Sequence, residues 1–124
     1  MKKIMIVDDD KDMTKMLGDL MSLAGFEPTL VNESNQAMDV ANTVNPDLFI
    51  LDLMMPEPNG FELCRMFRSD SNFSEKPILI ITAMDNGDSK GIAFAAGAND
   101  YVSKPFEPDM LTARIKKLLG KPKK

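Results

Sequence analysis

The chain is organised around the stretch Phe49-Ile50-Leu51-Asp52-Leu53-Met54-Met55-Pro56. Its apolar start follows Pro46 and Asp47, and Pro56 ends the extended segment. A short apolar run of this kind predicts a strand that is buried on both faces of a sheet. Asp52 then lies near the carboxyl end of that strand, which is where open α/β sheets place their ligands. A surface or turn role is the simpler interpretation of a lone carboxylate, so the rest of the chain has to decide.

The composition excludes several classes of protein. With 124 residues, 44% of them apolar, the chain is long enough for one domain with a core, so disorder is not expected. The net charge of −4 argues against a general nucleic-acid binder. One cysteine and no histidine exclude an internal disulfide, a thiol zinc cluster and histidine chemistry within the chain. Cys64 lies on an apolar helix face, which predicts a place in the core.

The amino-terminal residues predict no membrane or export signal. The apolar run behind Lys2 and Lys3 extends only from Ile4 to Val7 and is followed by three aspartates. This run is too short for a signal peptide, and no stretch approaches the length of a membrane span. We therefore expect a cytoplasmic protein.

Apolar periodicity divides the chain into alternating strands and helices. Strands are predicted at residues 4–7, 29–31, 49–52, 78–81 and 100–103. Helices are predicted at residues 12–24, 34–44, 61–69, 88–96 and 107–119. This alternation predicts a parallel sheet covered on both faces, with right-handed crossovers, in one domain.

Single residues add detail to this outline. Pro28 predicts that the second strand lies at a sheet edge, where a missing N–H is tolerated. Asp10 or Asp12 is expected to cap the first helix, and Gly25 to end it in a left-handed conformation. Gly87 and Gly91 predict a soft fourth helix, since each glycine costs about 1 kcal/mol relative to alanine in a helix interior.

Parallel strands share one carboxyl edge, and five polar residues meet there: Asp8, Asp9, Asp52, Thr82 and Lys104. Each has a plain alternative as a turn residue, a helix cap, a strand end or a solvated charge. Together, however, the carboxylates repel one another by roughly 4 kcal/mol per pair at about 4 Å and an effective dielectric of about 20. Such a cluster requires protonation or a cation, and magnesium prefers oxygen ligands. The set suits phosphoryl transfer onto a carboxylate, which gives an aspartyl phosphate.

These motifs resemble the receiver (CheY-like) domain of two-component response regulators. The resemblance extends over residues 3–119 and rests on Asp8-Asp9, Leu51-Asp52 with Met55-Pro56 and Gly60, Thr82-Ala83, and Lys104-Pro105-Phe106. It implies a flavodoxin-like, doubly wound (βα)5 fold with a five-stranded parallel sheet in the order 2-1-3-4-5. The receiver domain would span residues 1–120, and residues 121–124 would form a basic tail.

The resemblance also implies a role for each site residue. Asp52 would be the phosphoryl acceptor, and Mg²⁺ or Mn²⁺ would be held by Asp8, Asp9, Asp52 and the backbone carbonyl of Met54. Lys104, before a cis Pro105, would pair with the phosphoryl group. Thr82 would move its hydroxyl onto that group, Tyr101 would turn inward with it, and the small Ala83 would leave the approach open.

Two flanking positions depart from common receiver chemistry. Met54 and Met84 stand where polar residues of the family help to orient an attacking water. We hypothesise that the two methionines screen the phosphoryl group and prolong the phosphorylated state. The alternative is that both fill gaps in a chain that has 11 methionines.

The implied function is a two-state switch. A histidine kinase or a histidine phosphotransfer protein would supply the phosphoryl group, and the receiver would catalyse its own phosphorylation and dephosphorylation without turning over a separate substrate. The surface of the fourth helix, fifth strand and fifth helix would then change and control a protein target or an effector domain. We expect no direct nucleic-acid or membrane binding, and a monomer or a weak phosphorylation-dependent dimer.

Other functions remain open from the sequence. A phosphatase of the haloacid dehalogenase kind would need a second acid at Met54 and a longer chain. A flavodoxin-like electron carrier would need a phosphate loop where Asp8, Asp9 and Asp10 stand. Within the receiver family, the alternatives are a degenerate docking module or an excised receiver of a larger, for example DNA-binding, regulator.

Overall fold

The computed structural model describes residues 1–84 and 87–120. The strands are β1 (Lys3–Val7), β2 (Glu27–Val31), β3 (Leu48–Leu51), β4 (Ile78–Thr82) and β5 (Asp100–Ser103). The helices are α1 (Lys11–Leu23), α2 (Ala37–Val44), α3 (Gly60–Ser69), α4 (Gly87–Ala96) and α5 (Pro108–Leu119), with a 3-10 turn, η1 (Ser34–Gln36), before α2. The predicted basic tail, residues 121–124, lies outside the described residues.

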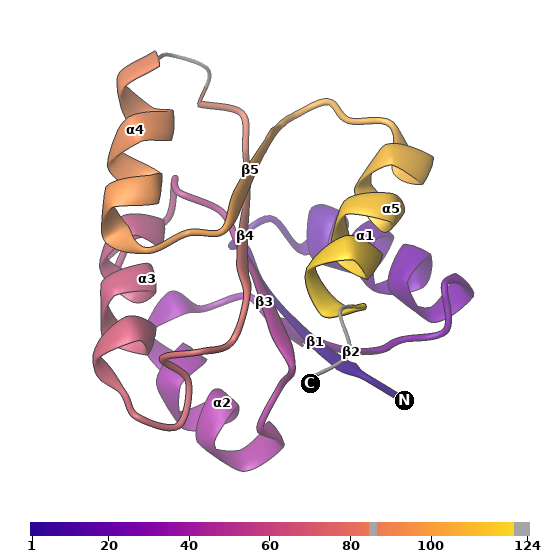
Figure 1. The fold of residues 1–124 in the computed structure, drawn as a ribbon, viewed down its shortest axis with the longest axis horizontal. Coiled ribbons are helices and arrows are strands. Elements are labelled where there is room, and N and C mark those ends of the chain that lie inside the picture. The colour runs from indigo at the N-terminus through magenta and orange to yellow at the C-terminus, as the bar shows by residue number, and fades with distance from the viewer. Residues whose placement is uncertain (85–86, 121–124) are drawn as a thin grey trace.

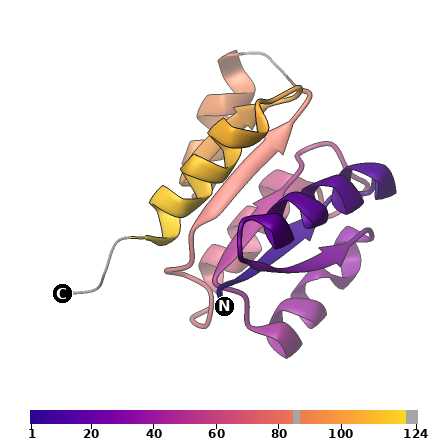
Figure 2. The ribbon, with the colours of Figure 1, turned by 90° about the vertical axis from the view of Figure 1, so that its right-hand side faces the viewer.

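The five strands form one parallel sheet, as the alternation of strands and helices predicted. Their order is β2-β1-β3-β4-β5, which is the order that the resemblance implied. In Figure 1 the sheet is seen nearly edge-on, with α2, α3 and α4 on one side and α1 and α5 on the other. The perpendicular view in Figure 2 brings α1 and α5 in front of the sheet. All strands run in one direction, so their carboxyl ends share one edge of the molecule.

Each face of the sheet has its own apolar core. Ile4 and Ile6 point to the layer under α1 and α5, while Met5 and Val7 point to the layer under α2, α3 and α4. This alternation follows from the two-residue period of a strand. Cys64 is fully buried in the second layer, where burial raises the pKa of its thiol. The prediction that this cysteine belongs to the core is confirmed.

The local features predicted from single residues are mostly confirmed. Asp10 caps α1 by accepting from the backbone N–H groups of Asp12 at 3.0 Å and Met13 at 3.2 Å. Gly25 has a φ of 94°, the left-handed conformation expected after that helix. Pro28 lies in β2, which is an edge strand. The boundaries of the elements are less exact, since β2 begins at Glu27 and α4 at Gly87.

One predicted helix has a different start. Residues 34–36 form a 3-10 turn, and the α-helix begins only at Ala37. The N–H of Gln36 donates to the Glu33 carbonyl over three residues, and the Ser34 hydroxyl donates to the Pro56 carbonyl at 2.8 Å. These bonds tie the segment to the loop after β3 and favour the tighter turn.

At the amino ends of β4 and β5, Arg68 of α3 links several loops. Its guanidinium donates five hydrogen bonds, to the carbonyl oxygens of Gly97, Phe73, Ser74 and Lys76 and to Oδ1 of Asn99, at 2.7–3.3 Å. All three nitrogens of the fork thus donate to neutral acceptors, which come from two loops, residues 73–76 and 97–99. One side chain thus links the two loops that precede β4 and β5.

No helix in the described part of the chain is long and apolar enough to cross a membrane.

Candidate functional site

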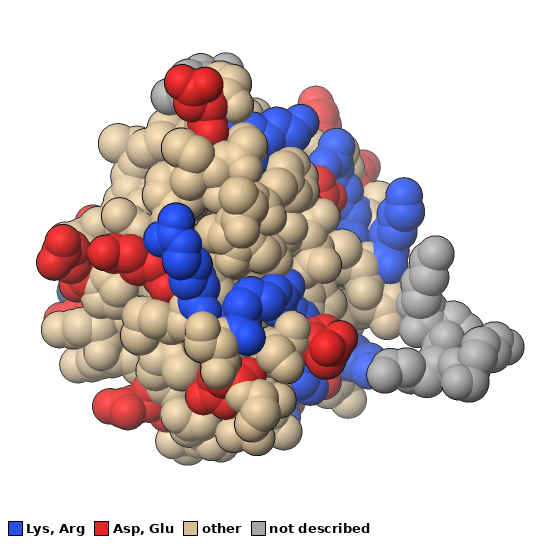
Figure 3. Space-filling view, turned by 60° about the vertical axis from the view of Figure 1, so that its left-hand side comes forward, with Lys and Arg blue, Asp and Glu red and all other residues tan. Residues whose placement is uncertain are grey.

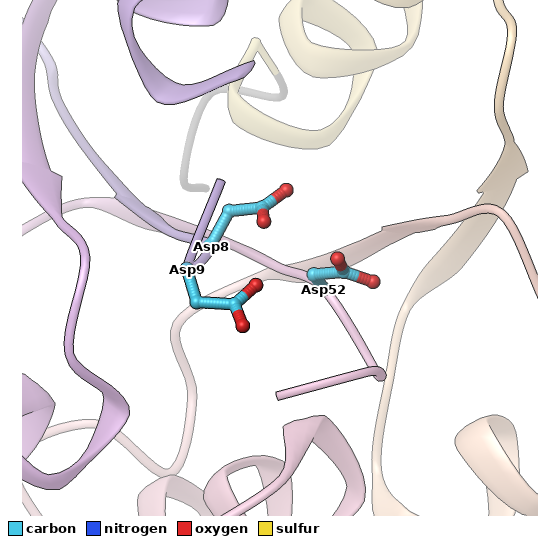
Figure 4. Close-up of side chains that lie close together, drawn as sticks. All are labelled: Asp8, Asp9 and Asp52. Atoms are coloured by element: carbon cyan, nitrogen blue, oxygen red, sulfur yellow. The ribbon is translucent and has the colours of Figure 1, made fainter. Parts of the chain in front are cut away.

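The strand order brings the carboxylates of β1 and β3 together. The Asp52 N–H donates to the Val7 carbonyl at 3.1 Å, which continues the ladder between β1 and β3 one step beyond the strand ends. Asp8 and Asp9 follow Val7 directly, so their side chains lie beside Asp52, as Figure 4 shows. One carboxylate oxygen from each of the three residues lies within 4.8 Å of the other two.

The three acids differ in exposure. Asp8 and Asp52 are buried, with 3% and 7% of their surface exposed, whereas Asp9 is exposed. The Asp8 Oδ1 accepts from the Asp10 N–H at 3.0 Å, and the Asp52 Oδ1 accepts from the Met54 N–H at 3.2 Å. These short-range bonds fix both buried carboxylates while leaving oxygen lone pairs for other partners.

Lys104 supplies the only cation that forms a salt bridge to these acids within the described residues. Its Nζ lies 2.9 Å from Oδ2 of Asp8 and 3.3 Å from Oδ2 of Asp52. The Lys104 N–H donates to the Thr82 carbonyl at 2.9 Å, which extends the β4–β5 ladder to the site. The peptide bond from Lys104 to Pro105 is cis.

Burial and charge shift two ionisation equilibria in the site. Burial raises the pKa of Asp8, assisted by the charge of Asp52 and opposed by hydrogen bonds from Asp10 and Lys104. Burial lowers the pKa of Lys104, but its hydrogen bond to Asp8 and the charges of Asp52 and Asp8 outweigh this and leave the pKa raised. The lysine therefore remains charged at neutral pH, while the charged form of Asp8 is disfavoured.

The donor set fits a hard divalent cation. Three carboxylates and one ammonium leave two negative charges uncompensated. One oxygen of each carboxylate lies within 4.8 Å of the other two, so all three residues could contribute ligands to one cation. A divalent cation would balance the two uncompensated charges. Carboxylate oxygens are also the ligands that such a cation prefers.

The flanking residues differ in their surroundings. Met54 exposes 55% of its surface, and Ala83 is also exposed. Met84 is half-buried and packs against the core under α2, α3 and α4. Gap filling in the core is therefore an adequate explanation for Met84 but not for Met54.

Thr82 and Tyr101 are connected through the backbone of Met84. Thr82 is fully buried, and its Oγ1 accepts from the Met84 N–H at 3.2 Å. The Tyr101 hydroxyl donates to the Met84 carbonyl, and only 8% of the tyrosine surface is exposed. Tyr101 thus lies inward in this structure.

Gly60 is required by a close approach of chain segments behind the site. A Cβ atom at this position would lie 2.3 Å from the Asp52 carbonyl oxygen and 2.7 Å from the Leu53 Cα. The Gly60 N–H donates to the Leu53 carbonyl at 3.2 Å. The first turn of α3 is thereby packed directly against the backbone that carries Asp52.

Sequence reasoning missed Asn32. Its amide Nδ2 donates to the Asp8 carbonyl and to Oγ1 of Thr14, both at 2.9 Å, and so fixes the backbone of the acidic pair. The signal was present, because Asn32 directly follows β2 and therefore belongs to the same carboxyl edge as the other site residues.

Comparisons with known proteins agree with this geometry. Residues 4–116 match the family described as response regulator receiver domain. The chain is 36% identical over 115 residues to the DNA-binding response regulator MtrA of Mycolicibacterium smegmatis, covering 93% of this chain and 49% of that protein. The chain thus spans about half the length of such curated relatives.

Solved structures are similar over nearly the whole chain. Chemotaxis protein CheY4 of Vibrio cholerae has a TM-score of 0.90 at 29% identity, covering 96% of this chain and 99% of that one. A putative response regulator from Chloroflexus aurantiacus has a TM-score of 0.92 at 35% identity, covering 97% and 98%. The BeF3-activated receiver domain of RstA from Klebsiella pneumoniae has a TM-score of 0.91 at 28% identity, covering 97% and 100%.

Proposed function

Because the chain belongs to the family of response regulator receiver domains, we propose that it is a phospho-acceptor switch in two-component signalling. Asp52 takes a phosphoryl group from a histidine kinase or a histidine phosphotransfer protein. The observation that supports this most directly is the buried Asp52 carboxylate, which lies beside both the Lys104 ammonium and the carboxylates of Asp8 and Asp9. The protein works in the cytoplasm beside its phosphodonor.

The reaction exchanges one bond to phosphorus for another. An Asp52 oxygen attacks the phosphorus of a phosphohistidine, a P–O bond forms, and the P–N bond to the imidazole breaks. The chain has no histidine, so it acts only as the acceptor. The reaction uses a lone pair of the Asp52 carboxylate oxygen, so no general base is required.

The other site residues would neutralise the negative charge of the phosphoryl group, either directly or by holding a cation. Lys104, which is 3.3 Å from Asp52, is placed to pair with the incoming phosphoryl oxygens. Asp8, Asp9, Asp52 and the Met54 carbonyl would hold Mg²⁺ or Mn²⁺, which when bound neutralises the developing charge on the phosphoryl group. The exposed Ala83 leaves room for the donor to approach.

Phosphorylation changes the surface formed by α4, β5 and α5. Thr82 moves its hydroxyl onto the phosphoryl group, and the connection through Met84 transmits this movement to Tyr101. On α4, Ile92 and Phe94 expose 45% and 41% of their surfaces. Figure 3 shows the adjoining face, formed by α2, α3 and α4, on which wide uncharged areas lie between scattered charges.

The decisive experiment is incubation with acetyl phosphate or beryllofluoride, with and without magnesium. Intact mass spectrometry and fluorine NMR follow the adduct. We expect a magnesium-dependent adduct in the native protein that is lost in Asp52→Asn. The matched control is Asp39→Asn, which removes an exposed carboxylate on α2 and leaves the adduct unchanged. An adduct that persists in Asp52→Asn, or that forms equally with a chelator present, contradicts the proposal.

A second proposal concerns the output. The MtrA relatives are named DNA-binding response regulators, and this chain spans about half their length. A receiver of this kind either binds a separate protein target or controls an effector domain in the same polypeptide. The position of the stop codon in the gene separates these alternatives.

A further inference from the structure

Asp9 is the acid of the cluster whose side chain has the fewest constraints of its own. Asp8 and Asp52 are both paired with Lys104, and each accepts a backbone N–H. The Asp9 carboxylate is exposed and forms no hydrogen bond or ion pair with any residue in 1–84 and 87–120. Within this part of the chain, its position is therefore constrained mainly by the backbone that carries it.

That backbone is held by hydrogen bonds before and after Asp9. The Asp8 N–H donates to the Val31 carbonyl at 3.1 Å, and the Asp10 N–H donates to Oδ1 of Asp8 at 3.0 Å. The peptide group between Asp8 and Asp9 is held by Asn32, whose Nδ2 donates to the Asp8 carbonyl at 2.9 Å. Among the described residues, no other side chain bonds to this peptide group.

Asn32 is itself fixed by Thr14 of α1. The Nδ2 atom carries two protons, and the second bond that it donates goes to Oγ1 of Thr14 at 2.9 Å. Thr14 is only 1% exposed, and its hydroxyl donates to the Lys11 carbonyl at 3.1 Å, which leaves Oγ1 as an acceptor. Both partners of Nδ2 accept, so the amide of Asn32 has one orientation that satisfies them.

We propose that Asn32 is a positioning residue of the cation site, which holds the Asp8–Asp9 peptide group so that the Asp9 carboxylate lies ready for a divalent cation. The inference rests on the proposed function, in which that cation assists phosphoryl transfer to Asp52. Without Asn32, binding of the cation must also order the peptide group and the exposed side chain, which opposes binding. Side chains that orient metal ligands without touching the metal typically contribute roughly tenfold to a hundredfold to metal affinity.

Mn²⁺ alone tests this proposal without any phosphodonor, because the electron paramagnetic resonance signal of the free ion measures how much is bound. In Asn32→Ala the net charge is unchanged but both donated bonds are lost, so the Kd for Mn²⁺ should rise about tenfold. The matched control is Asn35→Ala, which removes an exposed side chain of the same kind from the cavity that Asn32 and Asp9 also line. Its Kd for Mn²⁺ should not change.

Thr14→Val tests the same hydrogen bonds from their other end. Valine has the shape of threonine but offers no acceptor, so Asn32 loses one partner and keeps its bond to Asp8. The Kd for Mn²⁺ should rise by about threefold, as expected for one weakened hydrogen bond. The double variant with Asn32→Ala should bind no more weakly than Asn32→Ala alone, because Thr14 acts through Asn32. If Asn32→Ala fails to fold, Thr14→Val must still weaken binding.

A positioning role differs from a purely structural one in how the variant responds to metal. Asn32→Ala leaves Asp52 and Lys104 in place, so saturating Mg²⁺ should restore the acetyl phosphate adduct, with a higher concentration needed for half of the effect. An unchanged Kd for Mn²⁺ in Asn32→Ala overturns the proposal, even if urea unfolds the variant more easily and Asp52 accepts a phosphoryl group. A native protein that binds no Mn²⁺ overturns it as well. Conversely, weaker Mn²⁺ binding in Asn32→Ala supports the proposal even where the native protein forms no adduct, and then only the phospho-acceptor role fails.

Discussion

The two ends of the parallel sheet differ in how their charged side chains are paired. At the amino ends of β4 and β5, the guanidinium of Arg68 is surrounded by neutral oxygen acceptors, and each of its donor nitrogens forms a hydrogen bond. At the carboxyl ends, three carboxylates lie together, only Asp8 and Asp52 are paired with Lys104, and the site has excess negative charge. The first arrangement stabilises the fold, whereas the second retains unbalanced charge for a cation and a phosphoryl group to neutralise.

The largest effect on stability is therefore expected at the amino ends of β4 and β5, away from the candidate functional site. Arg68→Ala leaves several carbonyl groups without a donor and should lower the free energy of unfolding by about 3 kcal/mol. The midpoint of urea denaturation measures this loss. Arg65→Ala, which removes an exposed arginine from the same helix, is the control and should change little.

Phosphorylation should respond differently to the same change. Below its unfolding transition, Arg68→Ala should still form the magnesium-dependent adduct at Asp52, because Arg68 contacts none of the site residues named here. Loss of the adduct in a folded Arg68→Ala protein would show that the two ends are not independent.

Asp8→Asn is expected to raise stability and to impair formation of the adduct, the reverse of Arg68→Ala. The folded-state pKa of Asp8 lies above its ordinary value, mainly because of burial, so its charged form destabilises the fold. The contribution of Asp8 to the free energy of unfolding is therefore highest at a pH below the pKa that Asp8 has in the unfolded chain. It falls as the pH rises through the folded-state pKa of Asp8. In metal-free buffer near pH 7, Asp8→Asn should raise the free energy of unfolding on the order of 1 kcal/mol, because Lys104 keeps Asp52 as its partner.

The pH dependence identifies the cause. The gain from Asp8→Asn should disappear near pH 3, where the native Asp8 is protonated in both states. The adduct with beryllofluoride should be lost or greatly weakened at neutral pH. A gain in stability that persists unchanged in acid would mean that burial of charge is not its origin. Asp39→Asn again serves as the surface control.

The smallest effect is expected at the methionines, which belong to neither charge arrangement. Met54→Asn and Met84→Glu place polar groups that can orient a water, so the decay of phosphorylated protein should accelerate about threefold, roughly 0.7 kcal/mol in activation free energy. The larger part should come from Met54, which is more exposed than the core-packed Met84. Decay of the isolated phosphoprotein measures this directly. An unchanged rate in the double variant would remove the proposed screening role.

The sequence predicted best what depends on repeating patterns. Alternating strand and helix periods placed the five strands, and the resemblance to receiver domains implied their order. Because the strands are parallel, their last residues had to share an edge, so the meeting of Asp8, Asp9 and Asp52 followed from the topology alone. Pro28 was placed correctly at the edge for the same kind of reason, since a missing N–H excludes a central strand.

Residues outside such patterns escaped prediction. Phe73 stands alone in a polar segment, yet it is 1% exposed, with its ring centroid 5.6 Å from that of Phe49 and 5.7 Å from that of Phe67. A single aromatic residue has no period, so nothing local distinguishes it from a surface residue. Arg68 was missed because its acceptors come from segments up to 31 positions away in the sequence.

The burial of Ser89 was missed for a related reason. A serine in the first turn of a glycine-containing helix resembles an ordinary polar surface residue. Its burial arises from the packing of α4 against β5, where it contacts Tyr101, 12 positions away. Contacts between residues of different elements, each unremarkable alone, become visible only when the elements are placed together.

The ion pair between Lys104 and Asp8 joins residues that are 96 positions apart in the chain. The site therefore cannot exist on a nascent chain that still lacks β5, or in a molecule whose last strand has detached. A phosphodonor that requires this lysine in place would pass over incomplete and partly unfolded copies. The signal would then be carried only by fully folded molecules, and no separate quality-control factor would be needed.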